Sequence, residues 1–249
     1  MGAMWWRIAG LFLGLCALGC GKKKTGSGAG AGSGAGAGAG GKEDKVGDLV
    51  IRPIYHATVL FVVGGKTVLV DPVSKADLNG VKADLVLVTD VHQDHMDKEA
   101  ITRAQAGEVV APPAVVEQLG LGRPLANGEK MDWNGIGIEA VPMYNLVRGP
   151  EAGKLYHDKG RGNGYVLTMA GQRVYLSGDT ECIPEMKALT DIDIAFVCMN
   201  LPYTMPPAEA AECIRAFRPK ILYPYHYRSS NLDELGDLGA VEVRRRSWY

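Results

Sequence analysis

Four potential metal ligands lie within six residues of this sequence, directly after an aliphatic run. Leu85–Val88 is followed by Thr89 and then by a loop that contains two carboxylates and two imidazoles: Asp90, His92, Asp94 and His95. At this spacing the side chains cannot share one face of a helix or strand, but they can converge from an irregular loop. Imidazole and carboxylate together suit zinc, iron or manganese. The loop predicts a metal centre, with an exposed polar turn as the alternative.

Two further strand-like segments end in residues of the same kind. Gln172–Leu176 leads through Ser177 and Gly178 to Asp179, and Lys220–Tyr223 leads to His226. Glycine before Asp179 allows close backbone approach. The alternative for His226 is a core histidine satisfied by hydrogen bonds. Because three strand ends carry ligand-type residues, and the chain has only 5 histidines, we interpret the pattern as that of a metal-dependent enzyme.

The elements that position these side chains follow from hydrophobic period and turn residues. The predicted strands are Ala57–Val63, Lys66–Asp71, Leu85–Thr89, Tyr165–Met169, Arg173–Leu176, Ile192–Val197 and Lys220–Tyr223. The predicted helices are Lys98–Gln105, Pro112–Leu119 and Pro206–Phe217. Asp97 is the expected N-cap of the first helix. Composition alone indicates an α/β or α+β fold.

The order of these residues resembles the metallo-β-lactamase superfamily of metal-dependent hydrolases. Its usual core is Thr-His-x-His-x-Asp-His, a distant His, Gly-Asp-Thr and a final His, which Thr89–His95, Asp179 and His226 match. The resemblance extends from Ile54 to the end of the sequence and implies an α/β fold, the αββα sandwich with its metals at one edge of the paired sheets. Gly178–Thr180 and the segments after it resemble the ascorbate-6-phosphate lactonase-like branch, which implies ester, lactone or phosphodiester hydrolysis.

Two positions depart from the family motif. Asp90 replaces its first His, and the distant His is matched to Asn145. The resemblance then implies one complete site, of Asp94, His95, Asp179 and His226, and one altered site, of Asp90, His92, Asn145 and Asp179. A carboxylate adds negative charge and a harder donor. We expect divalent metals, zinc above all, with manganese, magnesium or ferrous iron possible at the Asp90 site. The alternative for Asn145 is a turn cap or a substrate contact.

The resemblance also implies catalytic roles. Asp94 would orient the attacking water and accept its proton, and Asp179 would bridge two ions. The glycine-rich loop Leu155–Gly164 precedes a strand and is expected to face a small-molecule substrate. The predicted substrate-binding residues are His157, Arg161 and Tyr203. Alternatively they are solvated loop residues and packed aromatics. His56 is expected to lie behind the ligands or under the sheet.

The N-terminal residues predict export. Residues 1–20 read as a lipoprotein signal peptide, in which Arg7 and an apolar run precede Ala17-Leu18-Gly19-Cys20, similar to the bacterial lipobox. Lipidation of Cys20, with Gly21 and not Asp after it, predicts anchoring in the cell envelope, on the periplasmic face of the outer membrane. Residues 21–45, rich in Gly and Ala, are a predicted flexible tether, and residues 46–249 the hydrolase domain. An uncleaved anchor and a soluble secreted protein are the alternatives.

The formal charge of -1 shows no basic excess, which makes nucleic acid an unsuitable partner. The expected partners are a small-molecule substrate and a membrane, through the lipid. Of Cys182, Cys198 and Cys213, an odd one must stay unpaired, and all three could be buried hydrophobes. Three functions remain open: a membrane-tethered metallohydrolase, a phospholipase or phosphodiesterase acting on lipid head groups, and a catalytically silent metal- or ligand-binding lipoprotein.

Overall fold

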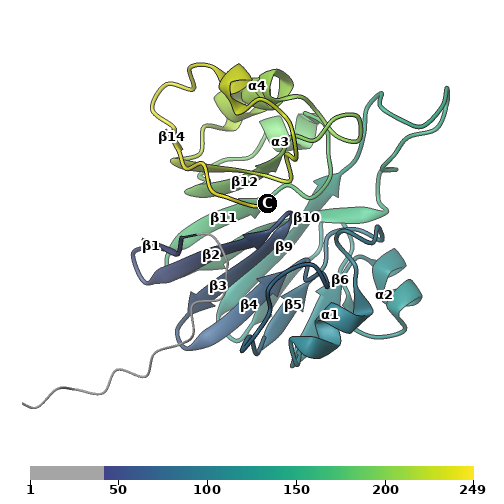
Figure 1. Cartoon of the computed structure of the whole chain (residues 1–249), viewed down its shortest axis with the longest axis vertical. Coiled ribbons are helices and arrows are strands. Elements are labelled where there is room, and N and C mark those ends of the chain that lie inside the picture. The colour runs from purple at the N-terminus through teal and green to yellow at the C-terminus, as the bar shows by residue number, and fades with distance from the viewer. Residues whose placement is uncertain (1–41) are drawn as a thin grey trace, which may run out of the picture. The chain divides into compact units, whose positions relative to one another are not determined.

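The computed structural model describes residues 42–249, which form two seven-stranded sheets (Figure 1). The first sheet contains, in spatial order, β1 (Asp44–Val46), β2 (Leu49–Tyr55), β3 (Thr58–Val63), β4 (Lys66–Val70), β5 (Leu85–Leu87), β6 (Glu108–Ala111) and β7 (Arg123–Pro124). The second contains β14 (Glu242–Val243), β13 (Ile221–Tyr225), β12 (Ile194–Cys198), β11 (Gln172–Leu176), β10 (Gly162–Met169), β9 (Ile136–Met143) and β8 (Lys130–Trp133). Both sheets mix antiparallel hairpins with parallel strands.

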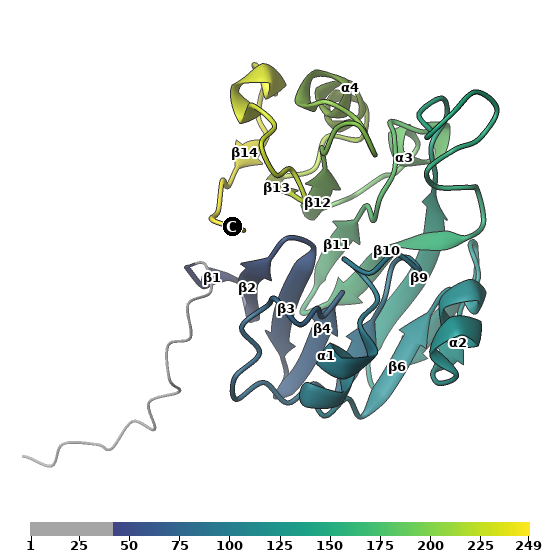
Figure 2. The ribbon, with the colours of Figure 1, turned by 45° about the vertical axis from the view of Figure 1, so that its right-hand side comes forward.

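Helices cover the outer faces of the paired sheets. α1 (Lys98–Arg103) and α2 (Pro113–Leu119) lie against the first sheet, whereas α3 (Pro184–Lys187), α4 (Pro207–Phe217) and the 3₁₀ turn η1 (Leu232–Leu235) lie on the side of the second (Figures 1 and 2). One apolar cluster joins both sheets to α4, and another joins the first sheet to α1 and α2. These layers are the αββα sandwich, and the predicted fold class is confirmed.

The local sequence explains these elements. β5, β12 and β13 are buried at every residue, as expected of parallel strands covered on both faces. Asp97 caps α1, because its carboxylate accepts the N–H of Ala100 at 3.0 Å. Proline opens α2, α3 and α4, where its missing N–H costs no helical hydrogen bond. The predicted strands and helices are all present, with ends shifted by a few residues.

The ends of the parallel strands gather the polar residues. β4 and β5 pair in parallel in the first sheet, and β11, β12 and β13 do so in the second. Asp71 follows β4, the loop of Asp90 to His95 follows β5, Asp179 follows β11, and His226 follows β13. The carboxyl ends of parallel strands share one edge of a sheet, so this topology collects the predicted ligands at one edge of the sandwich.

The folded part begins slightly earlier than predicted. β1 starts at Asp44, so residues 44 and 45 belong to the domain and not to the tether. Asp44 accepts hydrogen bonds from Arg246 and from the hydroxyl of Tyr223. The predicted signal peptide, Cys20 and most of the predicted tether lie outside the described residues. Within residues 42–249, no helix is long and apolar enough to cross a membrane.

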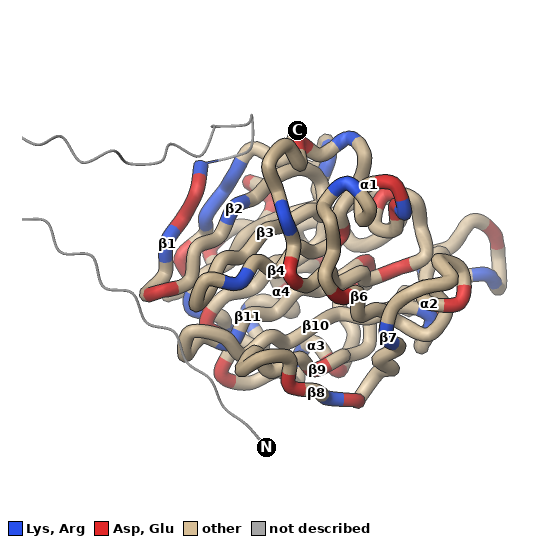
Figure 3. Tube along the Cα trace, turned by 90° about the horizontal axis from the view of Figure 1, so that it is seen from below, with Lys and Arg blue, Asp and Glu red and all other residues tan. Residues whose placement is uncertain are grey.

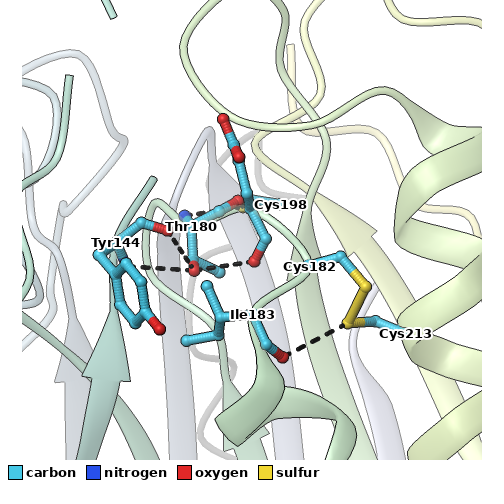
Figure 4. Close-up of a disulfide and its surroundings, with 7 residues drawn as sticks. Tyr144, Thr180, Cys182, Ile183, Cys198 and Cys213 are labelled. Atoms are coloured by element: carbon cyan, nitrogen blue, oxygen red, sulfur yellow. Dashed lines mark hydrogen bonds between the residues drawn. A yellow bond between two sulfur atoms is a disulfide. The ribbon is translucent and has the colours of Figure 1, made fainter. Parts of the chain in front are cut away.

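Two of the three cysteines pair. Cys182, in the loop after Asp179, forms a disulfide with Cys213 of α4 (Figure 4). Cys198 is buried and unpaired among the described cysteines, and its sulfur lies within hydrogen-bonding distance of the N–H and carbonyl of Thr180. The disulfide anchors the loop that carries Asp179, and as a disulfide sulfur Cys182 is no free thiolate for a metal. Basic and acidic residues are interspersed along the chain (Figure 3).

Candidate metal centre

The four ligands of the predicted complete site converge at the edge of the sandwich. His95 Nε2 lies 3.3 Å from Asp179 Oδ2, and His226 Nε2 lies 3.4 Å from Asp179 Oδ1. Asp94 closes the set, with its Oδ2 3.6 Å from His226 Nε2 and its Oδ1 4.0 Å from His95 Nε2. His95, Asp179 and His226 are buried, and the Asp94 side chain is 38 % exposed. The structure therefore brings together four residues from three strand ends.

A second set of donors meets the first at Asp179. His157 Nε2 is 3.4 Å from Asp179 Oδ2 and 3.9 Å from Asp90 Oδ2. His92 Nδ1 lies 2.8 Å from that same Asp90 oxygen. Asp90 and His157 are buried, whereas the His92 side chain is 42 % exposed. Asp179 thus faces both sets, as a carboxylate that bridges two ions would.

The residues present fit divalent ions. Donors about 2.0 to 2.2 Å from a tetrahedral ion are separated from one another by about 3.3 to 3.6 Å, which is the spacing found around Asp179. Three buried atoms that point at these positions, His95 Nε2, His226 Nε2 and Asp179 Oδ1, have no hydrogen-bond partner among the described residues. Buried polar groups are rarely left without partners. A cation bound between these three atoms would give each of them a partner.

A carboxylate behind His95 fixes which ring nitrogen is free. Asp71, fully buried, lies with its Oδ2 2.8 Å from His95 Nδ1. Asp71 also accepts the backbone N–H and the hydroxyl of Thr89, at 2.8 and 2.6 Å. Since a carboxylate only accepts, His95 donates from Nδ1 and leaves the lone pair of Nε2 for a metal. Burial raises the pKa of Asp71, whereas His95 and Thr89 oppose that shift.

The loop after β11 needs glycine before its ligand. Gly178 has a φ of +58°, and a Cβ on it would lie 2.6 Å from the Met143 sulfur and 3.0 Å from the Asn163 carbonyl oxygen. The predicted close approach of backbone at this glycine is confirmed. Burial opposes ionisation of Asp179, but the charges of His226 and His95 hold the pKa of its carboxyl well below the usual range. The chain is built to keep Asp179 ionised inside the protein.

His157, and not Asn145, occupies the position of the distant histidine. The Asn145 amide N–H groups are donated to Glu181 Oε1 at 3.1 Å and to the Tyr203 carbonyl at 2.9 Å, while its oxygen lies 2.6 Å from His157 Nδ1. The Asn145 amide is thus engaged by Glu181, Tyr203 and His157, and His157 is the side chain that reaches Asp179, so we correct the assignment of Asn145 as a ligand. It accepts from His157 Nδ1–H and leaves His157 Nε2 directed at Asp179, as Asp71 does for His95.

Glu181 is a functional residue that the sequence analysis missed. It is 1 % exposed and accepts the backbone N–H groups of Leu146, Val147 and Arg148 at 2.8 to 3.1 Å. The hydrogen bond from Asn145 and those three N–H groups overcome burial and lower its pKa. Glu181 thereby fixes the loop that carries Asn145. A glutamate one residue after Gly-Asp-Thr is the signal that could have indicated it.

Arg161 is committed to Asp90. Its Nε and Nη2 lie 3.1 and 2.9 Å from the two oxygens of Asp90, and its Nη1 donates to the Tyr156 carbonyl at 2.9 Å. Burial would raise the pKa of Asp90, but the hydrogen bond with His92 and the charge of Arg161 lower it to about 2. The sequence analysis predicted that Arg161 binds the substrate. In the structure its guanidinium is instead paired with Asp90. Together the pair is neutral, like the imidazole that Asp90 replaces in the family motif.

The open side of the centre is next to Asp94. A cavity of about 700 Å³ is bounded by Tyr55, His56, Val73, Gln93 and Asp94 together with α1 and the residues that precede it. His56 is buried, and its Nε2 lies 3.0 Å from Asp94 Oδ2, so it stands behind the ligands as expected. Burial lowers the pKa of His56 to about 4, which keeps the ring neutral at pH 7.

Tyr203 lies on the opposite side, beside the loop of His157. Its ring, 45 % exposed, meets Tyr156 edge-on with 5.1 Å between centroids. It does not bound the cavity next to Asp94. Its carbonyl accepts a hydrogen bond from the Asn145 amide, which in turn holds His157. Tyr203 therefore contacts a residue that positions His157.

This chain is similar to known proteins in sequence and in fold. The family described as the beta-lactamase superfamily domain matches residues 51–226. Metal-dependent hydrolases of Thermococcus onnurineus and Thermoplasma acidophilum are 26 % and 30 % identical to this chain, over 72 % and 73 % of it and 84 % and 85 % of their own lengths.

Solved structures agree with these matches. A candidate metal-dependent hydrolase from Parabacteroides distasonis superposes with a TM-score of 0.76 at 42 % identity, over 83 % of this chain and 97 % of that one. A metallohydrolase from Ignicoccus hospitalis gives 0.65 at 22 % identity, over 79 % and 94 %, and shows the shared fold. These relatives do not distinguish the ascorbate-6-phosphate lactonase-like branch, which stays a prediction.

Proposed function

Since the chain belongs to the metallo-β-lactamase superfamily and is a metal-dependent hydrolase, we propose that it holds two divalent ions that share Asp179 and cleaves an ester, lactone or phosphodiester bond of a small molecule. The observation that carries the proposal is the pair of donor sets that share Asp179 and open, at Asp94, into a cavity of about 700 Å³. Cavities of this size accommodate small ligands.

The chain's own residues divide the work. When bound, divalent ions supply a hydroxide nucleophile at neutral pH and polarise the oxygen of the bond to be cleaved. Asp94 is the carboxylate that reaches the cavity, where it can orient the attacking water and accept its proton. The neighbouring His226, the hydrogen bond from His56 and the charge of His95 outweigh burial and lower the pKa of Asp94, which keeps it ionised. Asp179 bridges the two sets and stays excluded from solvent.

The two sites differ in strength. The set of His95, Asp179 and His226 is buried and is completed by Asp94. The set of Asp90, His92 and His157 includes an exposed imidazole, and its carboxylate is shared with Arg161. A metal there must compete with the guanidinium for Asp90. We expect zinc in the buried site, and a weaker site at Asp90 that accepts zinc, manganese or iron.

A panel of substrates tests the proposed reaction. The full chain, purified without chelator, is assayed on generic phosphodiester, lactone and ester substrates while its metal content is measured. Turnover is expected to disappear on chelation, to return with added metal, and to be lost in Asp94→Ala and Asp179→Ala. Glu117→Ala, which removes an exposed carboxylate of α2 away from the cavity, is the matched control and should keep its activity. Turnover that persists in Asp179→Ala, or that ignores metal, would refute the proposal.

A specific surface favours the second candidate, hydrolysis of lipid head groups. Leu146, Val147, Leu201 and Tyr203 expose large apolar side chains, Val147 to 76 %. The two loops that carry them are joined at the Asn145 amide and the Tyr203 carbonyl, beside His157. Apolar loops next to an active site can contact a lipid surface. Faster turnover of phospholipid in vesicles than of soluble phosphodiesters, reduced in Val147→Ser, would select this function; no turnover of vesicle lipid would exclude it.

The proposed location is the cell envelope, through lipidation of Cys20, with the periplasmic face of the outer membrane as the site. The lipobox-like sequence before Cys20 supports it, and so does the disulfide between Cys182 and Cys213, because disulfides persist in oxidising compartments. Mass spectrometry of the mature N-terminus and fractionation of Cys20→Ser test it. An unmodified N-terminus at Met1 would contradict the lipid anchor.

The remaining candidate is a catalytically silent metal- or ligand-binding lipoprotein. Bound metal without turnover in the substrate assay would favour it.

A further inference from the structure

The segment after β14 brings the last residues of the sequence to the metal centre. Trp248 is buried, and its indole N–H donates to the Pro224 carbonyl at 2.8 Å. Its own carbonyl accepts the backbone N–H of His56 at 3.1 Å. The chain end accordingly lies beside the end of β2 (Figure 2). These contacts place the Tyr249 hydroxyl 2.8 Å from His56 Nδ1.

The donors and acceptors along this contact can be assigned from one end to the other. Asp94 is an ionised carboxylate and only accepts, so His56 must carry its proton on Nε2 to make the 3.0 Å hydrogen bond. The Nδ1 of a neutral imidazole is then an acceptor. The Tyr249 hydroxyl donates to it, and its oxygen remains free to accept the backbone N–H of Arg228 at 2.9 Å. Each group in this chain of hydrogen bonds has one role.

We propose that Tyr249 is a positioning residue of the metal centre, whose hydroxyl donates to Nδ1 of His56 and holds the imidazole so that its Nε2–H fixes the orientation of Asp94. Asp94 needs such support, because its side chain is 38 % exposed whereas His95 and His226 are buried. The effect on metal binding rests on the proposed function. The tautomer of His56, in contrast, can be measured in the chain without metal.

A competing assignment, with His56 as a metal ligand, requires the other tautomer of its ring. Its Nε2 lies close enough to Asp94 and His226 for the three to hold an ion themselves. A nitrogen that binds a metal cannot carry a proton, so His56 would then be protonated on Nδ1 and donate to Tyr249. The 3.0 Å separation of Nε2 from Asp94 Oδ2 is hydrogen-bond geometry, and it favours His56 as a donor.

Nitrogen NMR separates these assignments. The full chain is labelled with ¹⁵N at its 5 histidines, and long-range ¹H–¹⁵N spectra are recorded without metal and with zinc. His56 is identified by its absence in His56→Gln. We expect its Nε2 to be protonated and its Nδ1 to be pyridine-like in both states. Tyr249→Phe keeps the ring and removes the donor, so Nδ1 loses its hydrogen bond and its ¹⁵N resonance should move further toward the pyridine-like limit, while the bond to Asp94 keeps the proton on Nε2. Zinc affinity by chelator competition should fall about tenfold, the low end for groups behind a ligand.

Tyr227→Phe is the matched control. Tyr227 packs edge-on against Tyr249 at 5.5 Å between centroids, but its hydroxyl donates to the Arg246 carbonyl. This variant should leave the His56 spectrum and the zinc affinity unchanged. Protonation of His56 on Nδ1, or a Tyr249→Phe spectrum and zinc affinity equal to those of the wild type, would overturn the proposal. A chain with the expected tautomer that binds no zinc would support the Tyr249–His56 contact and refute the proposed function.

Discussion

Replacing Asp71 with Asn changes one atom of the carboxylate behind the ligand His95, and it should weaken metal binding strongly. Asp71 accepts from three donors: His95 Nδ1, the Thr89 hydroxyl and the Thr89 backbone N–H. An amide offers one acceptor oxygen. If that oxygen keeps the backbone N–H of Thr89, the new NH₂ group faces two donors, and His95 must move its proton to Nε2, the atom that faces Asp179. If the amide is turned round, the NH₂ group opposes the backbone N–H.

Either orientation is unfavourable. A buried donor left without an acceptor costs about 1 to 3 kcal/mol. Loss of a group behind a ligand histidine lowers metal affinity about 10- to 100-fold, which is about 1.4 to 2.8 kcal/mol at about 1.4 kcal/mol per factor of ten. We predict this loss for Asp71→Asn in zinc titrations against a competing chelator, while circular dichroism shows a folded chain.

Asp97→Asn is the control for this prediction. Asp97 caps α1 and accepts the N–H of Ser74 at 2.7 Å, without contact to a ligand. Asparagine is about as good an N-cap as aspartate, so zinc affinity should not change. A zinc affinity of Asp71→Asn within about twofold of the wild type would refute the assignment of the His95 tautomer.

Three further predictions follow from the same contacts. His157→Ala should remove the weaker metal, and Asn145→Ala should lower that site's affinity about 10-fold without abolishing it, as measured by metal titration; equal effects would contradict the distinct roles. Since the pKa of Asp90 is lowered to about 2, its pair with Arg161 should stabilise the metal-free fold above about pH 4 and lose this effect as the pH falls toward 2, so urea unfolding of Arg161→Gln should depend less on pH over that range. Reduction of Cys182–Cys213 should lower the free energy of unfolding by about 2 to 4 kcal/mol with metal content unchanged; no effect on unfolding would mean that the disulfide is absent.

The sequence predicted the strand ends well because their physics is local. Leu85–Val88 is a short aliphatic run followed by polar residues, and a buried parallel strand must end where the polar residues begin. The same argument placed Asp179 and His226. The β8–β9 hairpin was missed although Lys130–Trp133 alternates charged and apolar residues as a strand does, because four residues give only a short stretch of that pattern.

The errors at the site arose from contacts that are distant in the sequence. Asn145 follows β9 as a ligand would, but the loop after it returns to the same place and brings His157 there instead. Only the folded loop shows which side chain reaches Asp179. Arg161 lies 71 residues from Asp90, yet a signal existed: a buried carboxylate in place of an imidazole requires a nearby cation. The role of Tyr249 depends on a contact across 193 residues.

The metal stoichiometry of the full chain tests the account most directly. Protein purified without chelator and loaded with zinc is measured by mass spectrometry, together with Asp90→Ala and Asp179→Ala. We predict two ions in the loaded wild type, of which one is lost on mild dialysis, one ion in Asp90→Ala, and loss of tight binding in Asp179→Ala. No metal after loading, or full occupancy in Asp179→Ala, would contradict the shared centre, and two equally tight ions would contradict the unequal sites.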